Sequence, residues 1–147
     1  MKYYNREREI AKLQEVRELS YNDHSRLTVV TGRRRIGKTR LINNAMGDEP
    51  FIYLFVGRKN EASLCASYCK EIATKLNIFV PSITSFQELF AFLMQQGETK
   101  KFTLVIDEFQ EFFNVNSSIY SDIQNIWDQY RLKTHINFIV SGSVYSL

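Results

Sequence analysis

The segment from Gly32 to Thr39 has residue types and a spacing that suit phosphate binding. It reads GRRRIGKT and matches the pattern G-x-x-x-x-G-K-[ST], whose two glycines let the backbone turn tightly and direct N–H groups at a phosphate. Lys38 would reach the β- and γ-phosphates of a nucleotide, and the Thr39 hydroxyl would bind Mg²⁺. An apolar run precedes the segment and a helical pattern follows it, so the positive end of a helix would face the same anion. We therefore predict nucleotide contacts from Gly32, Arg33, Arg34, Arg35, Ile36, Gly37, Lys38, Thr39 and Arg40.

The arginines of this loop allow several interpretations. Three of them, Arg33 to Arg35, lie inside the loop, and Arg40 follows it. A basic run can bind the phosphates of nucleic acid. An accessory contact to phosphate, a contact with a protein partner and simple solvation explain the same residues equally well. No pattern of a recognition helix accompanies the arginines, so plain DNA binding has the least support.

An acidic pair follows another apolar run, in the stretch FTLVIDEFQEF. Asp107 would emerge at the carboxyl end of a buried strand and could hold Mg²⁺, directly or through a water next to Thr39. Glu108 could polarise a water for in-line attack on the γ-phosphate. A strand that simply ends in an acidic turn is the ordinary alternative. The phosphate loop upstream favours the functional interpretation.

The end of the chain, IVSGSVYSL, places polar residues at the tip of a further strand. A hydroxyl there can bind the γ-phosphate or the attacking water, and Ser141 is the first candidate, with Ser143 the second. Serines of an ordinary strand-to-loop turn would look much the same.

The sequence around the acidic pair also narrows the class of nucleotide-binding protein. A GTPase would show D-x-x-G here and N-K-x-D later, whereas this chain has DEFQ and no N-K-x-D. A transporter-type ATPase would carry L-S-G-G-Q, which is absent. The remaining class is an ATPase with Glu108 as its catalytic residue, beside a metal-binding Asp107.

Periodicity predicts the elements that must position these residues. Strands are expected over 26–31, 51–56, 102–107 and 136–142, and helices over 5–19, 38–46, 61–76, 85–96 and 118–132. The first helix would bury Ile10, Leu13, Val16 and Leu19, and Ser85 would cap the fourth. Strands that are continuously apolar and alternate with helices indicate a mostly parallel sheet covered on both faces, a three-layer α/β/α P-loop core. Ligands of such sheets bind at the carboxyl ends of the strands.

Composition fits one soluble domain. The chain has 147 residues, of which 44% are apolar and 24% charged, with a net charge of +3 that neither demands nor forbids an acidic partner. Apolar runs are too short to span a membrane and the N-terminus lacks the pattern of a signal peptide, so we expect a cytoplasmic protein. We expect Cys65 and Cys69 to be small buried hydrophobes rather than metal ligands. Phe109, Phe112 and Phe113 are expected in the core, although they could instead dock a partner.

The combination of YYNREREIAKL, TGRRRIGKTRLI, LVIDEFQEF and FIVSGSVYSL resembles the prokaryotic "archaeal ATPase" family, which is related to the AAA-type and STAND P-loop ATPases. The resemblance covers essentially the whole chain and implies a sheet of order 5-1-4-3-2 with ATP or ADP and Mg²⁺ at its carboxyl edge. It implies that Lys38 and Thr39 form the first nucleotide motif and Asp107 and Glu108 the second, with Ser141 at the sensor position. Candidates for base or ribose contact are Asn5, Arg6 and Glu7, although Asn5 stands where the family has glycine.

The family also implies parts that this sequence does not contain. Its members continue beyond the sensor strand with an arginine finger, a fifth strand, a helical lid and often a DNA-binding or nuclease-like domain. We therefore expect residues 1–147 to be a P-loop ATPase domain truncated after the sensor strand, with the phosphate-loop strand at a sheet edge.

Two functions follow as hypotheses. The first is Mg²⁺-dependent ATP binding and hydrolysis that drives a larger protein. The second is a nucleotide-gated regulatory or interaction module, like a STAND switch and in some settings associated with DNA, in which turnover is incidental. ATP is a partner in both, and a homo-oligomer or a protein partner is left open.

Overall fold

A computed structural model describes the backbone of residues 3–32 and 37–143, and side chains from residue 7 within those ranges. Four strands form one parallel sheet of order β1-β4-β3-β2. They are β1 (Arg26–Gly32), β2 (Ile52–Phe55), β3 (Lys101–Asp107) and β4 (His135–Ser143). The prediction of a parallel sheet is confirmed, and its order agrees with the last four positions of the sheet that the family resemblance implies.

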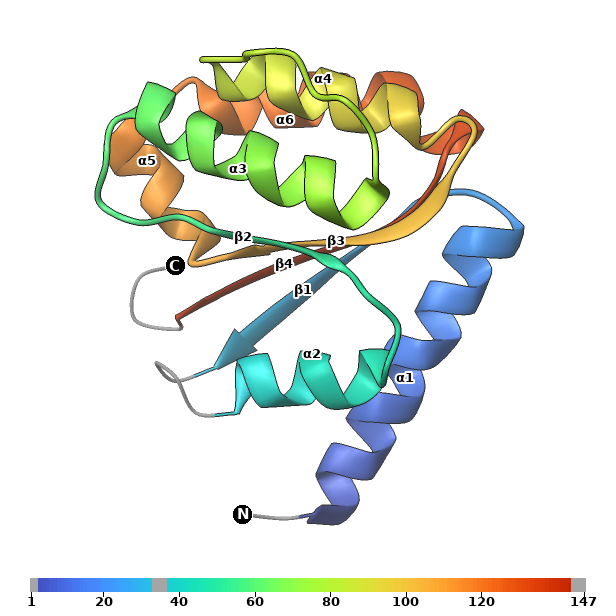
Figure 1. The fold of residues 1–147 in the computed structure, drawn as a ribbon. Coiled ribbons are helices and arrows are strands. Elements are labelled where there is room, and N and C mark those ends of the chain that lie inside the picture. Colours follow the sequence, from blue (N-terminus) through green and yellow to red (C-terminus); the bar gives the residue numbers. More distant parts are fainter. Residues whose placement is uncertain (1–2, 33–36, 144–147) are drawn as a thin grey trace.

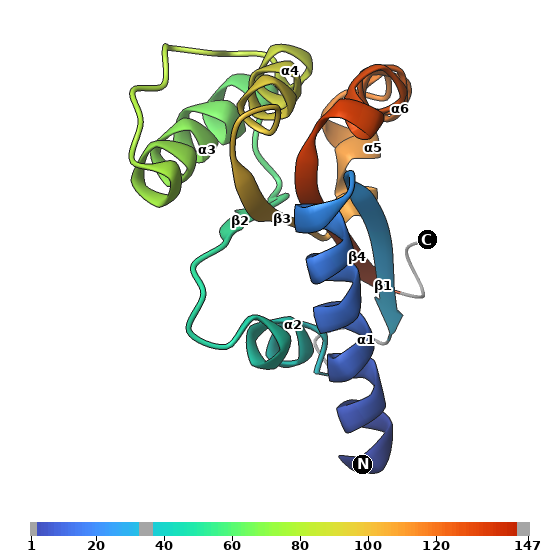
Figure 2. The same ribbon diagram turned by 90° about the vertical axis from the view of Figure 1, so that its right-hand side faces the viewer.

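Helices cover both faces of this sheet, as the three-layer prediction requires (Figures 1 and 2). On one face lie α1 (Tyr3–Asn22) and α2 (Lys38–Met46). The other face carries α3 (Glu61–Leu76), α4 (Phe86–Gln96), α5 (Phe112–Val115) and α6 (Ile119–Tyr130). Two short 3₁₀ turns complete the set, η1 (Phe109–Glu111) and η2 (Arg131–Lys133). None of the described helices is long and apolar enough to cross a membrane.

Each helical layer has its own apolar core. The larger one joins the sheet to α3, α4, α5 and α6, where the ring of Phe90 lies 6.0 Å from that of Phe86 and 5.4 Å from that of Phe138. The smaller one joins α1 and α2 to residues of β3 and β4, Val105 and Ile139. Ser85 caps α4 as predicted, because its hydroxyl accepts a hydrogen bond from the N–H of Glu88 at 3.2 Å.

The predicted buried stripe of the first helix is confirmed at Leu13, is partly buried at Ile10 and Val16, and is wrong at Leu19. Leu19 is exposed, whereas Ser20 is fully buried and its hydroxyl bonds the carbonyl of Val16 at 2.8 Å. Arg17 and Gln14 reach the carbonyl of Ala45 on α2. The inner side of α1 is therefore partly polar, since it meets the end of another helix as well as the sheet.

The prediction of a buried first strand is also wrong. Side chains of β1 alternate, with Leu27 47% and Val29 60% exposed. Within the described residues β1 pairs with β4 alone, so it is an edge strand, and the expected edge position of the phosphate-loop strand is confirmed. Leu27 and Val29 are the register partners of Phe138 and Val140, which belong to the larger core, but the helices of that layer leave the edge strand open.

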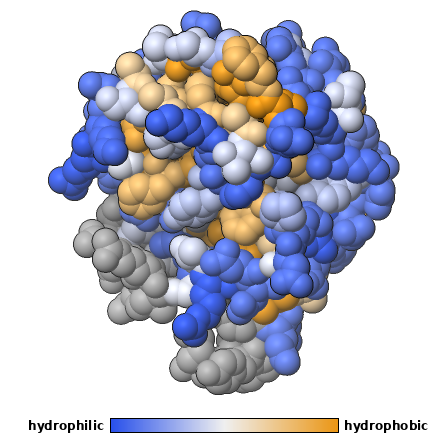
Figure 3. Space-filling view, viewed as in Figure 1, coloured by the Kyte–Doolittle hydropathy of each residue, from blue (hydrophilic) through white to orange (hydrophobic). Residues whose placement is uncertain are grey.

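Two further predictions of burial need correction. Cys65 is buried but Cys69 only partly so, because its thiol lies near the loop carbonyls of Pro81 and Ile83 rather than inside the core. Phe112 is buried, whereas Phe113 is 64% exposed, since the α5 turn directs neighbouring side chains to opposite sides. Figure 3 shows apolar patches in the upper and central part of this face of the molecule, among hydrophilic side chains.

Candidate functional site

The residues proposed to bind nucleotide and metal lie at the carboxyl edge of the sheet. Gly32, the last residue of β1, is the register partner of Ser143 on β4. Asp107, the last residue of β3, is paired with Ser141 on one side and with Phe55 on the other. Parallel pairing thus places the carboxyl ends of the four strands, which are distant in the sequence, side by side along one edge of the sheet.

The phosphate loop joins β1 to α2 on this edge. Gly37 has φ 74°, a left-handed conformation that a residue with a side chain rarely adopts, and α2 begins at the next residue. The side chain of Lys38 is buried and passes close to Gly32. A Cβ atom placed on Gly32 by a substitution would lie 3.7 Å from Lys38 Cγ. Thr39 and Arg40 are exposed in the first turn of α2. Arg33, Arg34, Arg35 and Ile36 lie outside the described residues, so their proposed contacts with nucleotide or DNA stay predictions.

Asp107 is held by three donors although it is almost completely buried. The Ser141 hydroxyl and the backbone N–H of Glu108 both donate to Oδ1, at 2.8 Å each. The phenol of Tyr53 on β2 donates to Oδ2. Hydrogen bonds to an ionised group are among the stronger ones in proteins, so this carboxylate has a fixed orientation.

Glu108 has an unusual backbone, with φ 56° and ψ 44°. Among the described residues other than glycine, only Asn77 shares a positive φ. The left-handed conformation costs such a residue about 1–2 kcal/mol, and strain of this sort gathers at functional sites. The Glu108 carboxylate accepts a hydrogen bond from the side-chain amide of buried Gln110 at 2.9 Å. The loop after β3 therefore holds the proposed catalytic carboxylate in one place.

The two serines of β4 have different surroundings. The hydroxyl of Ser141 donates a hydrogen bond to Asp107. The predicted sensor role therefore requires that this hydroxyl also accepts a hydrogen bond from the attacking water, or leaves Asp107 when nucleotide binds. Ser143 is equally buried, and its hydroxyl has no hydrogen-bond partner among the described residues. A buried hydroxyl without a partner is uncommon in proteins. Ser143 thus keeps its place as the second candidate.

Tyr53 is the site residue that the sequence did not indicate. An aromatic residue in an apolar strand is typical of a core, and only the fold brings its phenol to Asp107. Burial raises the pKa of Tyr53 well above its usual value of 10.0, and the hydrogen bond to Asp107 and the charge of that residue raise it further. The hydroxyl of Thr39 acts in the opposite direction as a hydrogen-bond donor and lowers the pKa.

The donor set at this edge fits a hard cation. Thr39 and Asp107 offer a hydroxyl and a carboxylate oxygen, which are ligands that Mg²⁺ prefers. Within the described part of the chain no group of three or more His, Cys, Asp or Glu side chains could hold a metal by itself. Mg²⁺ commonly takes one or two protein ligands and completes its shell with water and substrate phosphates. The site suits a metal that arrives with a nucleotide.

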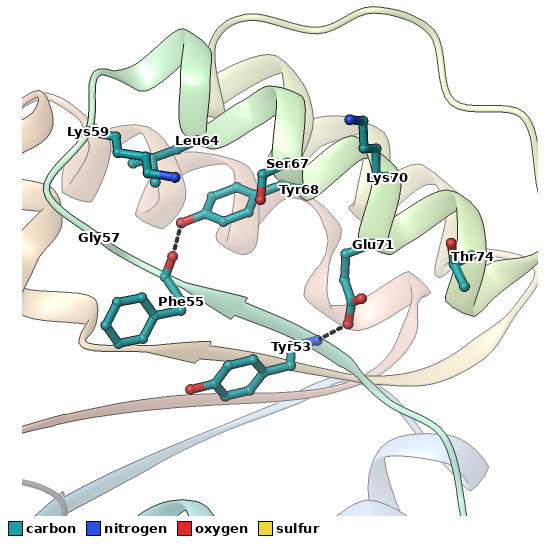
Figure 4. A pocket seen from close by; sticks show the side chains of 10 residues that line it. All are labelled: Tyr53, Phe55, Gly57, Lys59, Leu64, Ser67, Tyr68, Lys70, Glu71 and Thr74. Atoms are coloured by element: carbon teal, nitrogen blue, oxygen red, sulfur yellow. Dashed lines mark hydrogen bonds between the residues drawn. The ribbon is translucent and has the colours of Figure 1, made fainter.

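A hollow of about 600 Å³ lies on the outer side of β2, against α3 (Figure 4). The N–H of Tyr53 donates to Glu71 at 2.9 Å, and the hydroxyl of Tyr68 donates to the carbonyl of Phe55 at 2.7 Å. Side chains of α3 thereby occupy backbone groups of β2 that would otherwise be free to pair with another strand.

A parallel α/β sheet with a glycine loop between β1 and α2 and an acidic pair at the end of β3 defines the P-loop class of nucleotide-binding proteins. A family model described as "ATPase domain predominantly from Archaea" matches residues 3–147, and the chain belongs to this family. The chain is therefore the core of an ATPase domain.

Solved structures share the fold. Cdc6p from Pyrobaculum aerophilum has a TM-score of 0.64 and 22% identity, over 94% of this chain and 38% of that one. A Walker-type ATPase of Pyrococcus abyssi has a TM-score of 0.65 and 22% identity, over 93% of this chain and 44% of that one. The ORC2 protein of Aeropyrum pernix, in ADPNP and ADP complexes, has a TM-score of 0.58 and 16% identity, over 94% of this chain and 41% of that one. The chain spans about two fifths of the length of these proteins, and a search of curated proteins found no significant match.

Proposed function

We propose that this chain binds ATP together with Mg²⁺ and hydrolyses it, as the motor or switch of a larger protein. The fixed orientation of Asp107 carries the proposal. Three hydrogen bonds hold this carboxylate at the edge of the sheet where β1 ends and the phosphate loop begins. Lys38, Thr39 and the acidic pair Asp107–Glu108 are of the residue types that phosphoryl transfer needs.

The chain's own residues then take separate roles. The loop backbone and Lys38 bind the β- and γ-phosphates, and the start of α2 adds its positive end. Thr39 and Asp107 hold Mg²⁺, which when bound neutralises charge on the phosphates. Glu108 orients the attacking water and accepts its proton. Ser141 contacts the γ-phosphate or that water, with Ser143 as the alternative.

The nucleotide-gated module is the second candidate. It is favoured by the hydrogen bond between Gln110 and Glu108, which occupies the carboxylate that would activate water. In a module of this kind ATP or ADP sets a conformational state, and the bond to Gln110 persists when nucleotide is bound. Turnover is then slow whether or not an arginine from elsewhere completes the site.

Thermal unfolding with Mg²⁺-ATP, Mg²⁺-ADP and Mg²⁺-GTP tests nucleotide binding. Ligand at about a hundred times its Kd stabilises the native state by roughly 2.7 kcal/mol, which corresponds to roughly 5–10 °C in Tm for a domain of this size. We expect such a rise with adenine nucleotides and its loss in Lys38→Ala. A folded wild-type chain with no rise for any nucleotide would contradict the proposal.

Glu108→Gln separates the two candidates. For an ATPase, this variant keeps the thermal shift with Mg²⁺-ATP and loses phosphate release. For a gated module, cellular function survives Glu108→Gln but fails with Lys38→Ala.

A further inference from the structure

We propose that Tyr53 is a positioning residue of the magnesium site, whose phenol keeps the Asp107 carboxylate in the orientation that a metal ion needs. This inference rests on the proposed function, because it concerns Mg²⁺ bound together with a nucleotide. Tyr53 itself would not contact the nucleotide.

The hydrogen bonds of Asp107 leave one direction open to a cation. Each carboxylate oxygen has two lone pairs. Oδ1 already accepts from Ser141 and from the N–H of Glu108, whereas Oδ2 accepts from Tyr53. Oδ2 is therefore the oxygen that would be available to a metal ion or a metal-bound water, and its orientation depends on the phenol.

Tyr53 is itself held in place from both sides of its strand. It is paired with Val105 of β3, and its ring packs against the core formed by α1 and α2. Its N–H donates to Glu71, which also lies 2.8 Å from the ammonium of Lys75. Figure 4 shows the ring pointing away from α3, on the opposite side of β2 from the Tyr68 ring. A side chain anchored in this way can orient a ligand rather than follow it.

Tyr53→Phe removes only the hydroxyl, and Tyr21→Phe is a matched control. The Tyr21 hydroxyl is also hydrogen-bonded in a partly buried setting, 2.7 Å from Glu49 and 2.9 Å from Thr103. Thr103 lies on the same strand as Asp107 but four residues earlier, roughly 13 Å away along an extended chain. Both variants lose a phenol hydroxyl with a carboxylate partner, but only one of these lies at the metal site.

The measurement is calorimetric titration of ADP into each protein, in EDTA and over a series of Mg²⁺ concentrations. Outer partners of metal ligands typically contribute 10–100-fold to metal affinity. For Tyr53→Phe we expect metal-free ADP affinity within about twofold of wild type and an increase of about tenfold in the Mg²⁺ concentration that gives half of the full effect. Tyr21→Phe should leave both quantities unchanged, and both variants are expected to lower Tm because each loses a partly buried hydrogen bond.

An unchanged Mg²⁺ dependence in Tyr53→Phe would overturn the role of Tyr53, as would an equal change in Tyr21→Phe. In either case the wild type still binds Mg²⁺-nucleotide, so the proposed function stands. A wild-type chain that binds no ADP, or binds it without any effect of Mg²⁺, would overturn the proposed function and with it this role of Tyr53.

Discussion

The hydroxyl of Ser141 lies 2.8 Å from Oδ1 of Asp107 and donates a hydrogen bond to it. The two residues are register partners on neighbouring parallel strands, and both side chains are buried. The bond joins the predicted sensor strand to the predicted metal ligand. A change in the position of one strand end would therefore reach the other directly.

Ser141→Ala should reduce ATP turnover by roughly 10–100-fold while leaving nucleotide binding nearly intact. Loss of the hydroxyl leaves Oδ1 of Asp107 with one donor, so the carboxylate is less well oriented, and the protein loses about 1–3 kcal/mol of stability. Phosphate release and urea unfolding measure the two effects.

Ser143→Ala is the control, since that hydroxyl has no partner among the described residues. Removal of an unpaired buried hydroxyl is expected to be neutral or slightly stabilising. If turnover instead falls with Ser143→Ala and not with Ser141→Ala, the order of the two sensor candidates is reversed.

Glu108→Gly and Glu108→Ala should both abolish hydrolysis but differ in stability. Each removes the carboxylate and its bond to Gln110, so their difference reports the left-handed backbone. We expect the glycine variant to be about 1 kcal/mol more stable than the alanine variant, opposite to the order in a helix interior. Urea unfolding of the pair decides this, and an alanine variant of equal or greater stability would show that residue 108 carries no backbone strain.

Val29→Thr should leave stability unchanged to within about 0.5 kcal/mol, because Val29 is largely exposed on the edge strand. Val140→Thr, at its register partner on β4, should cost about 1–3 kcal/mol, because it places a hydroxyl in the larger core. Urea unfolding of the two variants tests whether the outer face of β1 is open in solution. Equal costs at the two positions would mean that another surface covers Val29.

Stability should fall in alkaline solution partly through Cys65. Burial, followed by the charge of Glu61, raises the pKa of this thiol from 9.0 to about 12. The unfolded chain then ionises above pH 9 while the native state does not, so this contribution is complete below pH 9 and is lost as the pH rises toward 12. Between pH 8 and pH 10 the wild type should lose about 1 kcal/mol more than Cys65→Ala. Equal losses in urea unfolding would mean that Cys65 does not contribute.

The sequence alone determined the class of the fold and indicated most of the candidate residues for its chemistry. Continuous apolar runs that alternate with helical patterns require a covered parallel sheet, and α2 and α3 have the predicted bounds. The phosphate loop and the acidic pair could be recognised because each is a local pattern whose residues are neighbours in the chain. The place of Asp107 beside Ser141 also followed in outline, since parallel strands end at one edge.

Only the tertiary structure decided which buried side chains contact the site and which apolar ones stay exposed. Tyr53 precedes Asp107 by more than fifty residues, and no local pattern distinguishes it from a core tyrosine. The edge position of β1 was expected from the family resemblance, but the exposure of Leu27 and Val29, which have the sequence of a buried strand, was not. The left-handed backbone of Glu108 likewise depends on how the loop after β3 packs. These features depend on contacts between segments far apart in the chain, and side-chain type and periodicity report only the neighbourhood of each residue.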